Sequence, residues 1–141
     1  MPLVRISLQA GNADSYRTAI SNGVYEAMRE TLNIPDGDRF QIITEHGHGQ
    51  LIADPSFMGM TRTGDFVLIQ IFLSRGRTTA IKQALYRRTV EKLCASPGLD
   101  PDNVMIVLTE VGLDDWSFGR GEAQYVLNPP VWAQSKEKIP A

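Results

Sequence analysis

The residues best suited to chemistry in this 141-residue chain begin with a proline at its start. Pro2 follows Met1, and methionine aminopeptidases generally remove Met before a residue as small as proline. Pro2 would then carry a free secondary amine, which can act as a nucleophile or carry a proton. The alternative remains open, because a proline is also tolerated at the first position of a strand without any chemical role.

Two arginines near the middle of the chain form the second candidate group. Arg75 and Arg77 stand in the stretch SRGR, immediately before a helical segment that Thr78 or Thr79 can cap. In extended backbone the two side chains project to the same side. Cations are usually placed at helix C-termini, since the N-terminus already carries partial positive charge. The pair therefore indicates an anion site suited to a carboxylate; the alternative is two solvated arginines flanking a helix.

Three further residues are candidates for the same site. Asp38 follows the turn IPDG and enters a predicted strand, from which it can reach a site at that end of the sheet. Its alternative role is a surface carboxylate paired with Arg39. Trp116 and Phe118 alternate in the stretch DDWSFGRG, after the last predicted strand. They can form an apolar wall over a pocket, or they can belong to the core.

His46 and His48 are of a type that binds metal, and in a strand they share one face. The sequence shows no third cluster of ligands beside them, so we expect no zinc site. The stretches GHG and GRG lack the full glycine pattern of a nucleotide-binding loop.

Length and composition indicate one soluble globular domain. The chain is long enough to bury a sizeable core, and its 14 basic and 16 acidic side chains argue against a nucleic-acid surface. Cys94 is the only cysteine, so an intrachain disulfide is impossible and a cytoplasmic location is expected. The pattern of a signal peptide and an apolar run long enough to cross a membrane are both missing.

An alternating strand opens a first β-α-β unit, predicted over about residues 2–45. Val4, Ile6 and Leu8 share one face of this strand. A helix with a period of three to four residues follows, and Asn12 or Asp14 can cap its start. The stretch RFQIIT is the second strand.

A second β-α-β unit is predicted over about residues 66–110, after a long connection at 46–65. Its first strand, residues 66–73, is almost continuously apolar, which is typical of a strand covered on both faces. A helix and another buried strand follow. One helix between two strands implies a parallel pair with a right-handed crossover.

The repeat suggests how the candidates meet. If the strand that begins at Pro2 pairs antiparallel with strand 66–73, then Pro2 faces Arg75 and Arg77. Residues 1–128 are predicted to be one domain, and residues 129–141 a tail over the surface or a neighbouring subunit.

Taken together, MPLVRISL, IPDGDRFQ, SRGR and DDWSFGRG resemble the tautomerase superfamily and, within it, the malonate semialdehyde decarboxylase branch. The resemblance runs from Pro2 to about Asn128. It implies an α+β fold, a tandem β-α-β repeat with a four-stranded mixed sheet and two helices on one face, assembled as a homotrimer. It implies no cofactor.

The resemblance also implies a role for each candidate. By position, Pro2 is the catalytic amine and Asp38 its acidic partner. The substrate-binding residues are Arg75 and Arg77 for the carboxylate, with Trp116 and Phe118 as an apolar wall.

The sequence differs from the patterns of related enzymes at three points, and these differences limit which branch it resembles. The first predicted helix lacks the histidine that the related cis-3-chloroacrylic acid dehalogenases use. With Cys94 alone, the CxxC motif of the macrophage migration inhibitory factor branch is impossible. Gly76 stands between the two arginines, where the resemblance leads us to expect a proline.

The expected activity is decarboxylation of a small 3-oxo acid such as malonate semialdehyde, giving acetaldehyde and CO2. A protonated Pro2 can stabilise the enolate that forms, or a neutral Pro2 can form an iminium. An arginine lowers the pKa of the amine and Asp38 raises it, so the residues leave its charge open; the resemblance implies the cation. The alternatives are a hydratase or keto-enol tautomerase acting on a small 2-oxo acid, and a non-catalytic trimer that binds carboxylates or proteins.

Overall fold

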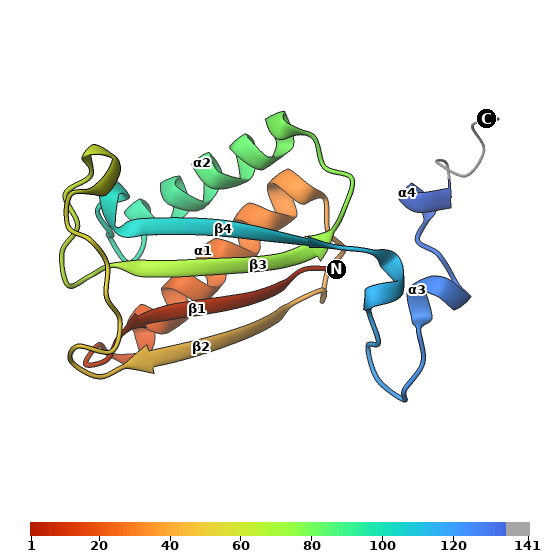
Figure 1. Ribbon diagram of the computed structural model, residues 1–141, viewed down its shortest axis with the longest axis horizontal. Coiled ribbons are helices and arrows are strands. Elements are labelled where there is room, and N and C mark those ends of the chain that lie inside the picture. The colour runs from red at the N-terminus through yellow and green to blue at the C-terminus, as the bar shows by residue number, and fades with distance from the viewer. Residues whose placement is uncertain (135–141) are drawn as a thin grey trace.

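One four-stranded sheet with two long helices on one face makes up most of the computed structural model, which describes residues 1–134 (Figure 1). The strands are β1 (Leu3–Gln9), β2 (Phe40–His46), β3 (Val67–Ser74) and β4 (Val104–Val111). The helices are α1 (Asp14–Leu32), α2 (Thr79–Ala95) and the short α3 (Gln124–Leu127) and α4 (Val131–Gln134). The predicted mixed sheet and its two β-α-β repeats are confirmed.

The strand order β2-β1-β3-β4 joins the two repeats through their first strands. Strands β1 and β2 are parallel, as are β3 and β4, whereas β1 and β3 are antiparallel. Leu3 lies opposite Phe72, so the start of β1 lies beside the end of β3. Figure 1 shows the N-terminus near the arrowhead of β3. The hypothesis of an antiparallel central pair is confirmed.

Alternation along the strands builds the core beneath the two helices. In β1, Val4, Ile6 and Leu8 are at most 1% exposed, as the sequence pattern predicts. They pack in one cluster with side chains of α1 such as Val24 and Met28. Each such aliphatic side chain contributes about 1.5–3 kcal/mol by leaving water, so the register of the sheet is firmly held.

The opposite face of the sheet corrects one prediction. Strand β3 is not covered on both faces within the chain, because Leu68, Gln70 and Phe72 are only partly buried. Their neighbours on this open face are large apolar side chains with 39–50% of their surface exposed: Phe40, Ile42, Met105 and Val107. The near-continuous apolar run of β3 therefore reflects one covered face and one open apolar face.

The two long helices begin differently. Helix α1 follows Ala13 and has no side-chain cap, so the prediction that Asn12 or Asp14 caps it is wrong. The Asn12 amide instead donates to the Gln9 carbonyl over 3.3 Å, and Asp14 lies in the first turn, where its charge suits the helix dipole. Helix α2 has the predicted cap, since Thr78 Oγ1 accepts from the Ile81 N–H over 3.2 Å.

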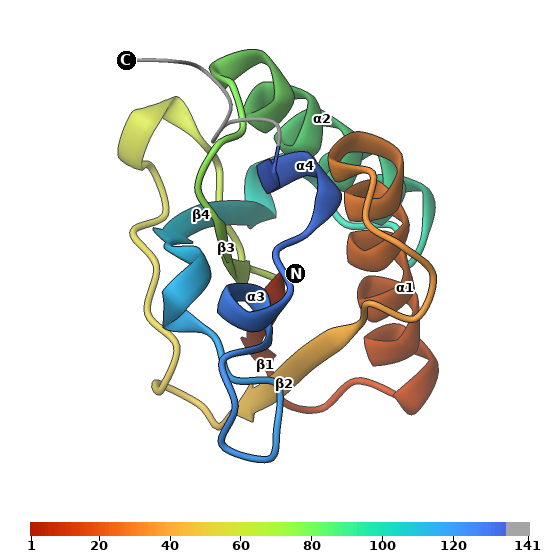
Figure 2. The ribbon, with the colours of Figure 1, turned by 90° about the vertical axis from the view of Figure 1, so that its right-hand side faces the viewer.

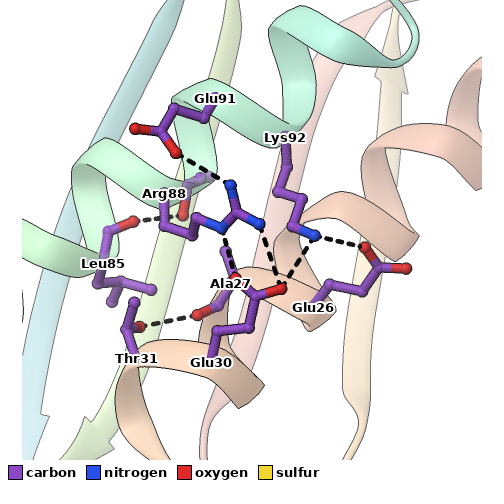
Figure 3. A network of polar contacts seen from close by, with 9 residues as sticks. Glu26, Ala27, Glu30, Thr31, Leu85, Arg88, Glu91 and Lys92 are labelled. Carbon is purple, nitrogen blue, oxygen red and sulfur yellow. Dashed lines mark hydrogen bonds and ion pairs between the residues drawn. The ribbon is translucent and has the colours of Figure 1, made fainter.

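Charged side chains link α1 and α2 on their outer side (Figure 3). Glu30 accepts from both Arg88 and Lys92, and Lys92 also pairs with Glu26 at 3.1 Å. Hydrogen bonds from Arg88 and Lys92 lower the pKa of Glu30 to about 2. Its contribution to stability is therefore present at neutral pH and fades as the pH falls towards 2. Because the network is exposed, the contribution is small.

Within residues 1–134, no helix has the length and apolar character needed to cross a membrane.

The close contact between α1 and α2 at Gly23 leads to a stability prediction. A Cβ on Gly23 would lie 2.9 Å from Cδ2 of the fully buried Leu93, so Gly23→Val should destabilise the protein by about 1–3 kcal/mol through overpacking. Leu93→Ala alone should cost about 2–5 kcal/mol by leaving a cavity. Urea unfolding at one fixed protein concentration measures both.

The double variant supplies the control, because the cavity left by Leu93→Ala makes room for the new valine. We expect the double variant to lose less stability than the sum of the two single losses. Strict additivity would show that the helices are not in contact at Gly23.

Candidate functional site

A pocket of about 590 Å³ opens at the end of the sheet where β1 begins and β3 ends. Met1, Asp38, Arg75 and Arg77 all line it. Figure 2 looks onto this end of the molecule and shows the N-terminus between α3 and α4. Charged groups from three segments that are far apart in the sequence therefore share one cavity within a single chain.

Asp38 faces the amino end of the chain. Its Oδ2 lies 3.6 Å from the Met1 amino nitrogen, and the two side chains are only 10% and 9% exposed. Its other oxygen, Oδ1, is buried and has no hydrogen-bond partner among residues 1–134. Asp38 can therefore accept one more hydrogen bond from a group that enters the pocket.

Arg39 does not pair with Asp38, so the alternative of a surface ion pair is wrong. The Arg39 guanidinium donates to Ser21 Oγ over 2.6 Å and to Asn22 Oδ1 over 2.7 Å. It also lies 4.8 Å above the ring of Tyr25. These contacts hold the Arg39 side chain against α1, so the Asp38 carboxylate lines the pocket without Arg39 as its partner.

Pro2 is buried, one residue inside the terminal amine. While Met1 is attached, the Pro2 nitrogen is an amide. The amine that faces Asp38 is then the primary amine of Met1. Removal of Met1 would move the free amine by one residue and make it secondary.

The two arginines differ in their surroundings. Arg77 is partly buried, and its Nη1 donates to the Ser74 carbonyl over 2.8 Å. Arg75 is exposed, and its backbone N–H donates to the Val111 carbonyl over 2.9 Å. Between them Gly76 has a φ of 126°, which proline cannot adopt. The glycine found in place of the expected proline thus gives this loop its own backbone conformation.

Burial and charge act in opposite directions on the amine. Desolvation lowers the pKa of the Met1 amino group, and the charge of Arg77 lowers it further. Asp38 raises the same pKa through its charge and a hydrogen bond. Desolvation also lowers the pKa of Arg77, against the charges of Tyr125, Glu110 and Asp38. Protonation of the amine therefore depends on the balance between Asp38 and its surroundings.

Trp116 and Phe118 are not among the residues that line the pocket. Trp116 Nε1 donates to Ser74 Oγ over 3.2 Å, and its ring stacks on Phe118 with centroids 5.6 Å apart. Phe118 meets Tyr125 edge to face at 4.8 Å, and Tyr125 does line the pocket. The two predicted wall residues thus stand behind Tyr125, and their role in substrate binding stays a prediction.

Sequence reasoning missed two aromatic residues of the pocket. Tyr125 lies in the four-residue helix α3, which is too short for a periodic pattern to reveal. Trp132 is the one aromatic residue in the sequence of the predicted tail, and this signal was available. Pro130 and Trp132 of the predicted tail line the pocket of their own chain. Residues 135–141 of that tail are outside the described residues. Within residues 1–134, no three side chains form a group that could bind a metal ion around His46 or elsewhere.

A sequence model described as "Tautomerase enzyme" matches residues 38–119, and a second model with the same description matches residues 2–58. The chain belongs to the tautomerase family. It is 32% identical to "Probable tautomerase YusQ" of Bacillus subtilis (strain 168), over 89% of this chain and 99% of that protein. The expected resemblance to the tautomerase superfamily is confirmed.

Two solved structures relate this tautomerase to malonate semialdehyde decarboxylases. The FG41 enzyme inhibited by 3-bromopropiolate is 39% identical, with a TM-score of 0.85, over 92% of this chain and 98% of that one. A second malonate semialdehyde decarboxylase, studied for its decarboxylase and hydratase activities, is 28% identical, with a TM-score of 0.85 over 92% and 99%. A symmetric trimer of fused 4-OT shares the fold, at 22% identity and a TM-score of 0.74 over 89% and 98%.

The contact between Asp38 and the terminal amine generates a prediction that needs no substrate. Because Asp38 raises the pKa of the amine, Asp38→Asn should lower it. At a given pH below the pKa, a larger fraction of the amine should then be neutral in the variant than in the unaltered protein. The variant should therefore react faster with an amine-specific acylating reagent. The pH dependence of that reaction rate, followed by peptide mass spectrometry of the N-terminal peptide, measures the shift.

Asp36→Asn is the matched control, since Asp36 lies two residues away and pairs with Arg29 outside the pocket. It should leave the titration of the amine unchanged. Equal titration curves for Asp38→Asn and the unaltered protein would contradict this electrostatic assignment.

Proposed function

We propose that this tautomerase removes CO2 from a 3-oxo acid such as malonate semialdehyde, without a cofactor, using Pro2 as its amino-terminal residue after loss of Met1. The observation that carries the proposal is the shared pocket of the chain's amino end, Asp38 and the two arginines. The likeness to two malonate semialdehyde decarboxylases supports the choice of reaction.

The arginines would hold the carboxylate that leaves. A guanidinium binds a carboxylate through two parallel N–H donors, and the partial burial of Arg77 strengthens such a contact by excluding water. Arg75, which is exposed, would meet the substrate from the mouth of the pocket.

A protonated Pro2 would act on the carbonyl. A secondary ammonium has two N–H groups, of which one can donate to Asp38 and the other to the carbonyl oxygen of the substrate. As the C–C bond to the carboxylate breaks, its electron pair forms an enolate and CO2 departs. The N–H donor stabilises the oxygen where this negative charge develops. Transfer of the ammonium proton to the enolate carbon gives acetaldehyde, and water then returns a proton to Pro2.

A second candidate reaction is hydration or keto-enol tautomerisation of a 2-oxo acid. The observation that favours it is the lowered pKa of the buried amine, because a neutral amine can act as a base. The name of the relative from Bacillus subtilis, a probable tautomerase, also points to tautomerisation. A trimer that only binds carboxylates is the alternative outside catalysis.

We also propose that the chain assembles as a homotrimer. The apolar open face of the sheet supports assembly, because single chains rarely leave large contiguous apolar patches in water. The trimer of fused 4-OT supports the number of copies.

Decarboxylation through the Pro2 amine requires that Met1 is removed, which the intact mass of the protein tests first. We expect mass spectrometry to show that the purified protein lacks Met1 and begins with Pro2. This protein should release CO2 from malonate semialdehyde, and both Pro2→Ala and Arg77→Ala should lower kcat/KM by roughly 100-fold or more. Coupled detection of acetaldehyde measures the rate.

Arg87→Ala is the matched control, since Arg87 is an exposed arginine of α2 that does not line the pocket. Its kcat/KM should stay near that of the unaltered protein. A panel of 2-oxo acids in the same assay separates the alternatives. Unchanged decarboxylation in Pro2→Ala would exclude Pro2 as the catalytic group.

If three copies pack through the open apolar face of the sheet, the protein should be a trimer in solution. Light scattering after size-exclusion chromatography should give about three times the chain mass of 15.6 kDa. Ile42→Glu, a charge on the exposed apolar face, should shift the protein towards smaller species. Gln83→Glu, on the exposed surface of α2, is the control and should leave the mass unchanged. A monomer in the unaltered protein contradicts the assembly.

A further inference from the structure

The pocket is large for a three-carbon acid. Its volume of about 590 Å³ falls within the range of roughly 300–1,000 Å³ that holds drug-sized ligands. The charged groups occupy only part of the wall. The apolar part is formed by side chains of three separate segments: Leu32, Ile34, Ile81, Tyr125, Pro130 and Trp132.

Trp132 connects the apolar part of the pocket wall with Arg77. Its ring centroid lies 5.6 Å from Cζ of Arg77, within the distance of a cation–π contact. Helix α4, which carries it, packs against the molecule through Ala133, which is only 9% exposed. The indole thus covers one side of the guanidinium and borders the pocket at the same time.

The position of Arg77 leaves room for a bound carboxylate. One of its five N–H donors is given to the Ser74 carbonyl, and a carboxylate can pair with two of the others. An acid bound in this way would extend its carbon chain into the pocket, whose apolar lining includes Leu32 and Trp132. A three-carbon chain ends before it fills that space.

We propose that the pocket takes carboxylates with an apolar substituent as large as a phenyl ring, and that Trp132 is the residue that determines this preference. The inference rests on the proposed function for the chemistry at the carboxylate. It extends that function by naming the substrate class, 3-oxo acids with an apolar group on the side away from the carboxylate. Contact with the indole and with Ile34 would bury that group from water.

Unreactive acids test the inference independently of catalysis. Isothermal titration calorimetry on the full-length protein compares propanoate with 3-phenylpropanoate. Burial of the ring should make 3-phenylpropanoate bind about tenfold tighter or more. Arg77→Ala should weaken both acids, which shows that both use the carboxylate site. Equal affinity for the two acids overturns the inference.

Substitution of Trp132 tests whether this residue causes the preference for 3-phenylpropanoate over propanoate. Trp132→Ala should lower the affinity for 3-phenylpropanoate to near that for propanoate, whereas Trp132→Phe should keep at least part of the difference. Val131→Ala, at an 82% exposed position of the same helix, is the control and should bind like the unaltered protein. A preference that survives Trp132→Ala overturns the role of Trp132.

The two proposals can fail separately. If the binding preference is found but no 3-oxo acid loses CO2, the reaction is wrong and the ligand class stands. If malonate semialdehyde is decarboxylated and propanoate binds as tightly as 3-phenylpropanoate, the reaction stands and the ligand class is wrong.

Discussion

The pairing of β1 with its two neighbours is the constraint on which the pocket depends. Because β1 and β2 are parallel with Leu3 opposite Phe40, the residues just before these strands lie together, and Asp38 meets the amino end of the chain. Because β1 and β3 are antiparallel, the loop that follows Ser74 reaches the same end of the sheet. A shift of two residues in either register moves a group by about 6–7 Å, which is enough to separate the amine from Asp38 or from Arg77.

The third pairing brings the aromatic residues to this end. Strands β3 and β4 are parallel, with Ser74 opposite Val111, so the segment after β4 starts beside the arginine loop. The chain then passes through Trp116 and α3 to α4, whose Trp132 lines the pocket. Figure 2 shows α3 and α4 at this end of the molecule. One sheet thus gathers the charges, and the chain beyond the sheet covers them with aromatic side chains.

The charges and the strands were predictable from the sequence, because both depend on local patterns. Alternation in MPLVRISL fixes which side chains of β1 enter the core, and the repeat of two β-α-β units predicts the pairing that brings Pro2 towards Arg77. The first turn of α1 was not predictable in this way. Several residues there have side chains able to cap, and only the backbone shows that Ala13 occupies the cap position.

The apolar parts of the site were harder to predict, because they depend on tertiary contacts. A run such as residues 66–73 looks the same whether its second face is covered or open, and in this chain that face is open. Tyr125 and Trp132 lie in four-residue helices, which have no period to detect. Trp116 and Phe118 stack on each other behind Tyr125, an arrangement that their spacing alone does not specify.

The open apolar face and the pocket occupy different parts of this chain. The pocket lies at the ends of the strands and is lined by residues of one chain, whereas the exposed apolar side chains of β2 and β4 lie on the broad face of the sheet opposite α1 and α2. Packing of copies through that face would hold the registers of β1, β2 and β3 against slippage without contributing any of the four charged groups that line the pocket. Assembly would therefore act on the site by keeping Asp38, Arg77 and the amine in their relative positions.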